Sequence, residues 1–253
     1  MLGSTRAERR GDRYIINGRK IYISRVQQSD LMLLLARTAP RPSQAQRSAG
    51  LSIFLVDLRT AGDAIEVRPL RMMMNNHVNE LEIRDLEIPA ENLIGEEGNG
   101  FRAIVDGWNA ERILIAGECI GDARWFVERA ARYASTREVF DRKLGQNQSI
   151  QFAIASAYAQ TEAADLMRFR AAELFDAGQP CGPEANLAKL LTSNAAWAAA
   201  NACVDTFGGN GFNAEYDVER KFRETRLYQV APISNNLILG YLGNRVLGMP
   251  KSF

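Results

Sequence analysis

The sequence has few cysteines and only one histidine. Cys119, Cys181 and Cys203 are odd in number and far apart, with no C-x-x-C pair. Disulfide frameworks and structural zinc sites need paired or clustered cysteines, so we expect neither, and we expect the three thiols to be buried as small apolar groups. A single histidine, His77, excludes a multi-histidine metal site and any Ser-His-Asp system that does not use it. We therefore predict no metal site.

The sequence also lacks an excess of charge and a long apolar run. Lys plus Arg (31) balance Asp plus Glu (30), so nothing indicates a nucleic acid or an anionic membrane as partner. No apolar run approaches the roughly 20 residues of a membrane span. The N-terminus also has no apolar core like that of a signal peptide. These absences predict a cytoplasmic protein that binds a small ligand.

The first ninety residues have the alternation and turn signals of strands, and at 253 residues, 46 % hydrophobic, the chain can form one large or two modest domains. Asn17-Gly18, inside YIINGRKIYIS, predicts a tight hairpin between two strands. Four further runs predict strands: DLMLLLART, GLSIFLVDL, AIEVRPL and NELEIRDLEIP, the last ended by Pro89. We expect a small antiparallel β-barrel or sandwich over residues 1–95.

After ENLIGEEGNG the periodicity becomes helical, and it predicts five helices. Their expected spans are 99–135, 149–178, 183–207, 216–228 and 233–247. Long helices joined by short loops pack antiparallel, so residues 96–253 are expected to form an up-down four-helix-bundle domain. The predicted fold class is therefore α+β, with the small β domain first.

Glu111 and Arg112 are adjacent charges in an apolar part of the first helix. At 100° per residue they fall on either side of an apolar stripe through Trp108, Ile115 and Cys119. Buried charges are costly unless they are paired or used. Two interpretations remain open from spacing alone: a structural ion pair with other helices, or a functional site at the edge of the bundle.

Two further segments carry groups that suit a flat, phosphate-bearing ligand. TREVFDRKLGQNQSIQ (136–151) offers Arg137 for a pyrophosphate, Phe140 for stacking, and the amides of Asn147 and Gln148. It is equally readable as a polar connector. FGGNGF (207–212) has glycines that allow a close backbone approach to a ligand or a left-handed helix end.

Seven collinear segments together resemble the acyl-CoA dehydrogenase family. They are YIINGRKIYIS, GLSIFLVDL, NELEIRDLEIPAENLIGEEGNGF, ERILIAGECIG, REVFDRKLGQNQSIQ, FGGNGF and YDVERKFRETRLYQ. The resemblance implies a middle β domain, incomplete at its start, and a C-terminal helical domain that assembles homodimers or homotetramers. It also implies FAD at a subunit interface, and places the start of the chain after the family's N-terminal helical domain.

The family resemblance assigns site residues one by one. Tyr22, Ile23 and Ser24 match the strand beside the flavin ring. Arg137 and Phe140 match an Arg-x-x-Phe that contacts the neighbouring subunit's cofactor, followed by amides at Asn147 and Gln148. Phe207, Gly208 and Gly209 match a loop near the adenosine end of FAD. Asn109 and Arg112 match positions that meet the CoA portion of the substrate.

The same resemblance implies α,β-dehydrogenation of an acyl-CoA to the trans-2-enoyl-CoA, with electron-transfer flavoprotein as the usual acceptor. Most members carry the base, a Glu, where this chain has Pro232; a smaller branch carries it immediately before the helix Arg, the position of Glu111. Asp141, Lys143 and Asp205 also depart from the family pattern. A non-catalytic subunit or fragment, serving oligomerisation or acyl-CoA binding, is the alternative.

Overall fold

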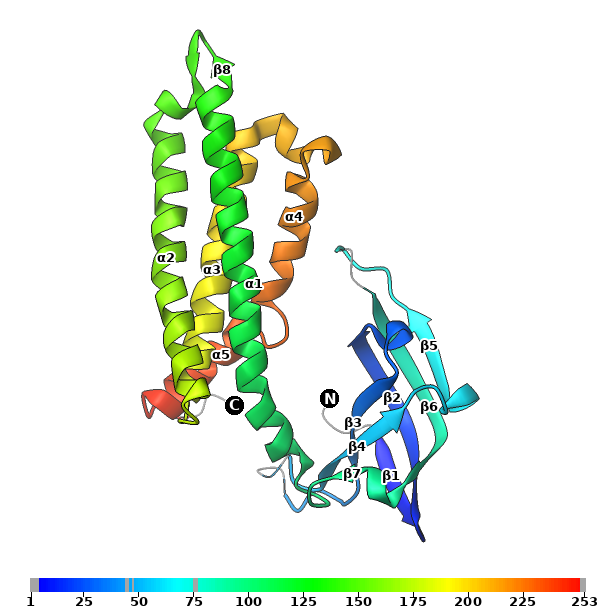
Figure 1. Cartoon of the computed structure of the whole chain (residues 1–253). Coiled ribbons are helices and arrows are strands. Elements are labelled where there is room, and N and C mark those ends of the chain that lie inside the picture. The colour runs from blue at the N-terminus through cyan, green and yellow to red at the C-terminus, as the bar shows by residue number, and fades with distance from the viewer. Residues whose placement is uncertain (1–4, 44–45, 47, 75–76, 251–253) are drawn as a thin grey trace. The chain divides into compact units, whose positions relative to one another are not determined.

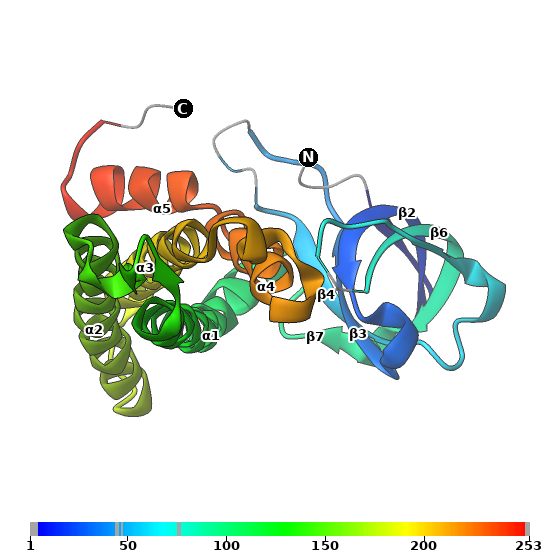
Figure 2. The same ribbon diagram turned by 90° about the horizontal axis from the view of Figure 1, so that it is seen from above.

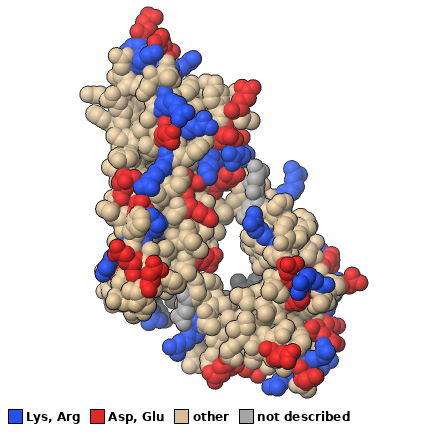
Figure 3. Space-filling model, viewed as in Figure 1, with Lys and Arg blue, Asp and Glu red and all other residues tan. Residues whose placement is uncertain are grey.

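The computed structural model describes residues 5–43, 46, 48–74 and 77–250, and it divides into two compact units, Met1–Gly107 and Trp108–Phe253. The first unit contains the large sheet, and the second contains most of the helical sequence (Figure 1). None of the described helices is long and apolar enough to cross a membrane. On the face shown in Figure 3, basic and acidic side chains are interspersed, in keeping with their nearly equal totals.

The first unit is a seven-stranded sheet with the order β5-β6-β2-β1-β3-β4-β7. Its strands are β1 (Arg6–Arg10), β2 (Arg13–Ser24), β3 (Leu31–Arg37), β4 (Leu51–Asp57), β5 (Ile65–Pro69), β6 (Val78–Pro89) and β7 (Leu93–Ile94). All pairs are antiparallel except β1 with β3. The described part of the sheet curls but keeps β5 and β7 as two edges, so the expected barrel is open and not purely antiparallel (Figure 2).

The hairpin predicted at Asn17-Gly18 is wrong. Both residues lie inside the continuous strand β2, and the turn between β1 and β2 is at Gly11-Asp12. The Asn17 amide is used across the sheet instead: its Nδ2 donates to Asp85 Oδ1 (2.9 Å), and its Oδ1 accepts from the Asp85 backbone N–H (2.8 Å). This pair coincides with a register irregularity between β2 and β6, where Asp85 has φ of 46°.

The core of the sheet unit consists of the inward-facing residues of its strands. Tyr14 and Phe54 meet edge to face, with ring centroids 4.8 Å apart, and the Tyr14 hydroxyl donates to Glu97 (2.9 Å). The fully buried aliphatic partners come from three strands, β2, β3 and β6: Ile16, Leu34, Leu81 and Ile83. Alternation along the strands therefore predicts the buried face correctly.

The second unit is built on three long helices: α1 (Gly100–Thr136), α2 (Gln148–Asp176) and α3 (Gly182–Phe207). With α4 (Val218–Thr225) they run alternately up and down, and α5 (Asn235–Tyr241), continued by a π-helical turn Leu242–Val246, lies across one end (Figures 1 and 2). A small hairpin, β8 (Glu138–Val139) and β9 (Arg142–Lys143), connects α1 to α2. The predicted bundle and the spans of the three long helices are thus confirmed, whereas the helices expected at 216–228 and 233–247 are shorter α-helices, each continued by a 3₁₀ or π-helical turn.

Small side chains dominate the helical core and allow close packing. Phe126 lies among buried alanines that include Ala123, Ala130, Ala196 and Ala200. The three cysteines are buried and free, as predicted.

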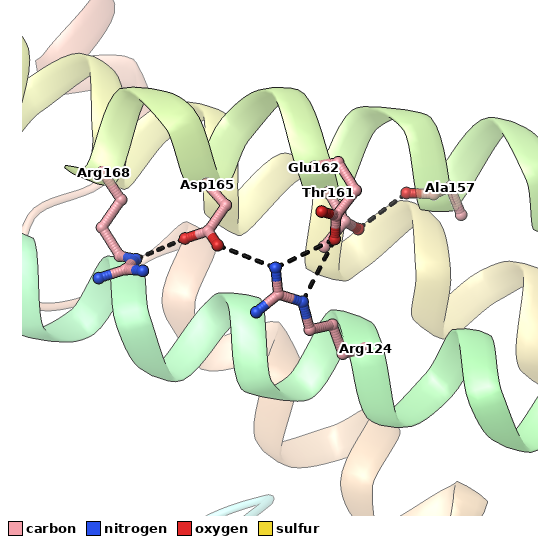
Figure 4. A network of polar contacts seen from close by, with 6 residues as sticks. All are labelled: Arg124, Ala157, Thr161, Glu162, Asp165 and Arg168. Carbon is pink, nitrogen blue, oxygen red and sulfur yellow. Dashed lines mark hydrogen bonds and ion pairs between the residues drawn. The ribbon is translucent and has the colours of Figure 1, made fainter. Parts of the chain in front are cut away.

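A polar network joins α1 to α2 (Figure 4). The buried Asp165 accepts from Arg124 Nη2 (2.9 Å) on one oxygen and from Arg168 Nε (2.6 Å) on the other, and Arg124 also bonds the half-exposed Glu162 (3.1 Å). This network fixes the register of the two helices.

Candidate active and cofactor sites

Arg112 is a buried guanidinium near the start of the helical unit. Its Nη1 donates to Asn109 Oδ1 (3.1 Å), while its Nε is buried without a hydrogen-bond partner. Burial lowers the pKa of Arg112, and the nearby Glu111 and Tyr241 oppose that shift. The guanidinium is thus partly desolvated and has a donor to spare, which suits an acceptor group of a ligand.

Glu111 lies on the exposed side of α1. Among the residues that the structure describes, it makes no ion pair, so a structural ion pair does not explain its position. Trp108, expected in the buried stripe, is 37 % exposed, and the buried face of α1 begins at Arg112 and continues through Ala116 and Cys119. The expectation that both charges flank a buried stripe thus holds for Arg112 and is wrong for Glu111, which is open to a ligand or a partner.

The loop before α5 lies at the same end of the unit as Arg112. Lys189 of α3, fully buried, donates from Nζ to the Ile233 carbonyl (2.7 Å) and to Asn235 Oδ1 (2.9 Å). Burial lowers the pKa of Lys189 to about 8; a nearby Cys119 opposes this shift and Arg112 adds to it. Sequence reasoning missed Lys189, because a lysine in an alanine-rich helix gives no signal until its contacts are known.

The predicted cofactor residues of the α1–α2 connection gather at the opposite end of the helical unit, around the β8–β9 hairpin (Figure 1). Phe140, at its tip, is 94 % exposed, and Phe140 and Asp141 both have left-handed φ, 52° and 59°. Arg137 and Gln148 are also exposed. Asn147 accepts a hydrogen bond from Arg142 and donates to the Leu144 carbonyl (2.8 Å), so its amide is largely occupied in holding the hairpin.

The FGGNGF loop lies at this same end because Phe207 packs on the last turns of α1. Its ring is buried, stacks on Tyr133 at 4.0 Å between centroids, and meets Tyr216 edge to face. The ring therefore belongs to the core and is not presented to a ligand. Gly208 and Gly209 are the exposed part, and a Cβ at either would meet no atom within 4 Å. The glycines thus leave room for close approach of a ligand.

A cavity of about 370 Å³ lies between α1 and α2 near the hairpin. Its lining includes Val127, Ala131, Ser135, Gln151, Ile154 and Tyr158. It adds an amide, a hydroxyl and a tyrosine to the exposed groups at this end, and Gln151 and Tyr158 were not among the predicted site residues.

In the sheet unit, Tyr22, Ile23 and Ser24 form the irregular end of β2. Tyr22 is 66 % exposed and has φ of 62°, at a register shift between Lys20 and Ile23. The fully buried Asn79 donates to the Ile23 carbonyl (3.3 Å) and so holds the irregular strand. The bulge turns an aromatic ring outward from the strand.

Comparison with known proteins gives these two units a class. Residues 1–86 match the family model described as acyl-CoA dehydrogenase, middle domain, and residues 98–245 match that described as acyl-CoA dehydrogenase, C-terminal domain. The arrangement is thus that of the middle and C-terminal regions of an acyl-CoA dehydrogenase. The chain belongs to the acyl-CoA dehydrogenase family.

Individual relatives agree with the family models. Cyclohex-1-ene-1-carbonyl-CoA dehydrogenase of Syntrophus aciditrophicus is 35 % identical over 96 % of this chain and 58 % of its own length. An acyl-CoA dehydrogenase of Bacillus subtilis is 33 % identical over 96 % of this chain and 64 % of its own length. The solved butyryl-CoA dehydrogenase of Megasphaera elsdenii has a TM-score of 0.89 at 28 % identity, covering 97 % of this chain and 63 % of that one. The chain therefore spans about three fifths of the length of these relatives.

Proposed function

We propose that this chain carries the base and the CoA-binding arginine of a flavin-dependent acyl-CoA dehydrogenase. Glu111 removes a proton from the α-carbon of a CoA thioester, and the electrons of that C–H bond form the α,β double bond as hydride leaves the β-carbon. FAD, when bound, would supply the acceptor for that hydride at its N5. The product is a trans-2-enoyl-CoA. Dehydrogenation of this kind is a reaction of fatty acid metabolism.

The observation that carries this proposal is the pairing of an accessible carboxylate with a buried, incompletely bonded guanidinium. Arg112 is fixed by Asn109 and keeps Nε unused, so it can hold an anionic or carbonyl group of the CoA moiety beside Glu111. Pro232 offers no carboxylate in the segment where most of the family carries its base. Glu111 is then the base that the resemblance leaves.

The groups at the hairpin end fit the requirements of FAD. Arg137 offers an exposed guanidinium for a pyrophosphate, Phe140 an exposed ring for stacking, and Gln148 an exposed amide, while Gly208 and Gly209 leave space for close approach. Tyr22, Ile23 and Ser24 are the proposed flavin-ring contacts of the sheet unit. Asn147 supports the hairpin rather than offering a free amide.

A homo-oligomer is the proposed assembly. From Glu111 to Thr136 the continuous helix α1 extends about 38 Å, more than the diameter of a small domain, so one small ligand does not reach both ends of the unit. The residues at the hairpin end would then serve a neighbouring subunit's cofactor. The exposed apolar side chains Phe152, Leu166 and Phe169 give α2 a surface suited to such contacts. Three further statements stay predictions: that electron-transfer flavoprotein is the acceptor, that the domains span 1–95 and 96–253, and that the protein is cytoplasmic.

Substitution of Glu111 tests the proposal, with Glu118 as control because it is also exposed on α1. The chain is supplied with FAD and butyryl-CoA, and bleaching of the flavin absorbance is followed. Glu111→Gln should slow bleaching about 10²- to 10⁴-fold with little change in CoA-ester affinity, because only the proton acceptor is lost. Glu118→Gln should behave like wild type. Equal bleaching rates in all three proteins would reject Glu111 as the base.

A non-catalytic subunit is the second candidate, favoured by the open position of Glu111, since a carboxylate base works best when shielded from water. This function predicts a chain that binds CoA esters but never bleaches FAD alone, and that co-purifies with a full-length homologue. A catalytically competent homo-oligomer would exclude it.

A further inference from the structure

Lys189 holds the loop that leads into α5. Its ammonium, fully buried on α3, donates to the Ile233 carbonyl (2.7 Å) and to Asn235 Oδ1 (2.9 Å), one on each side of Ser234. The Asn235 amide in turn donates to Ser193 Oγ (3.1 Å) and Asn194 Oδ1 (3.0 Å). The loop is thus attached to α3 by a network centred on one charged group.

The charge of Lys189 is not balanced within this network. Both acceptors are neutral carbonyl oxygens, and Lys189 has no ion pair among the described residues. Arg112, another buried cation, acts on it electrostatically and helps to lower its pKa. Burying a charge without a counter-ion is costly, and a neutral side chain could have filled the same volume. Because Glu111 partly offsets Arg112, Lys189 is the buried cation left without a counter-ion among the described residues, and its charge makes the potential at this end of the bundle more positive.

This loop contains Pro232, which lies where most of the family carries its base. A proline has no backbone N–H, so it cannot donate to a thioester carbonyl at this position. Negative charge develops on that oxygen when the α-proton leaves, and fixed positive charge stabilises it. The loop therefore lacks a backbone hydrogen-bond donor at Pro232, the position where the thioester carbonyl would need one.

We infer that Lys189 is a positioning residue for the acyl-thioester end of the site: it fixes loop 231–235 through Ile233 and Asn235, and its charge favours the enolate-like thioester. The inference rests on the proposed function, since that function brings a thioester to this loop. Lys189 acts through the loop and its field and does not touch the substrate.

The test compares the full chain with Lys189→Met, which keeps the length of the side chain but removes its charge and donors. Lys221→Met is the matched control, because Lys221 is a partly buried lysine of the same unit that pairs with Asp122, away from the loop. Asn235→Ala is the second variant, because it removes one acceptor while leaving the charge and the Ile233 contact, and it serves if Lys189→Met does not fold.

Amide hydrogen exchange measures how firmly the loop is held, and it requires no enzymatic activity. The Leu237 and Ile238 amides bond to Ser234 at the start of α5 (3.3 and 3.2 Å), so they report its anchoring. In Lys189→Met their exchange should accelerate about tenfold or more, with a smaller acceleration in Asn235→Ala and none in Lys221→Met. Unchanged exchange in both loop variants overturns the anchoring role.

Calorimetric affinities for butyryl-CoA and for free CoA measure how much the acyl-thioester end contributes to binding. The wild-type preference for butyryl-CoA should fall about tenfold in Lys189→Met, with the affinity for CoA unchanged, because only the thioester end has been altered. If amide exchange in the loop accelerates but the preference for butyryl-CoA over CoA stays unchanged, Lys189 does not act on the thioester. A wild-type chain without any preference contradicts the proposed function, and this role with it, whereas the exchange measurement still decides whether Lys189 anchors the loop.

Discussion

Lys189 makes the stability of the helical unit depend on pH in a defined direction. Its pKa falls from 10.5 to about 8 on folding because the charge is buried. Below pH 8 both the folded and unfolded states are protonated, and above 10.5 both are neutral. Between these values the unfolded chain holds a proton that the folded chain has released, so the free energy of unfolding rises with pH. At about 1.36 kcal/mol per pKa unit, the gain is about 3 kcal/mol.

The measurement is urea unfolding of wild type and Lys189→Met, followed by circular dichroism between about pH 7 and pH 11. Burial raises the pKa of the Cys119 and Cys203 thiols to about 12, and it also raises the pKa of Tyr228. These three groups therefore lower the free energy of unfolding of both proteins as the pH rises. The effects of Cys203 and Tyr228 cancel in the difference, whereas that of Cys119 cancels only in part, because Cys119 interacts with Lys189. The wild-type value minus the variant value should therefore rise by about 3 kcal/mol. A difference that stays flat would refute the assignment of a buried, titrating ammonium.

Four further substitutions test the packing by the same urea titration. Asp165→Asn should lose about 1–2 kcal/mol, because two guanidinium groups share that buried carboxylate, whereas Glu162→Gln in the exposed arm should lose under about 0.5 kcal/mol; equal losses would contradict the network. Asp141→Gly should gain about 0.5 kcal/mol by relieving a left-handed φ, and a loss would show that the aspartate side chain stabilises the turn. Phe207→Leu should lose about 1–2 kcal/mol with its stacking on Tyr133, and a neutral result would place that ring outside the core.

Periodicity predicted the fold where local sequence and tertiary packing agree. The three long helices begin and end within about two residues of their expected limits, because each carries its own apolar face and end signals. Asn17-Gly18 failed because the decisive partner, Asp85, is 68 residues away in the chain. Local turn chemistry cannot anticipate a side chain that pairs across the sheet.

The site was predictable to a different degree at its two ends. Motif resemblance selected Arg112 and the exposed hairpin, and the structure brings the helical residues into two groups that spacing alone did not separate. The exposure of side chains was less predictable. A helical wheel places Trp108 on the apolar face, but it contains no information on which neighbouring elements cover that face, and Trp108 is in fact exposed. Lys189 was invisible for the same reason: its role depends on a loop 44 residues further along.

The separation of the two groups along α1 has a genetic consequence. If each chain contributes its Glu111 end to one site and its hairpin end to another, two differently damaged chains can complement each other in a mixed dimer. Random pairing of Glu111→Gln chains with chains altered at Phe140 would make about half of the dimers mixed, each with one intact site, and so restore about a quarter of all sites. Two alleles, each inactive alone, would then support growth together.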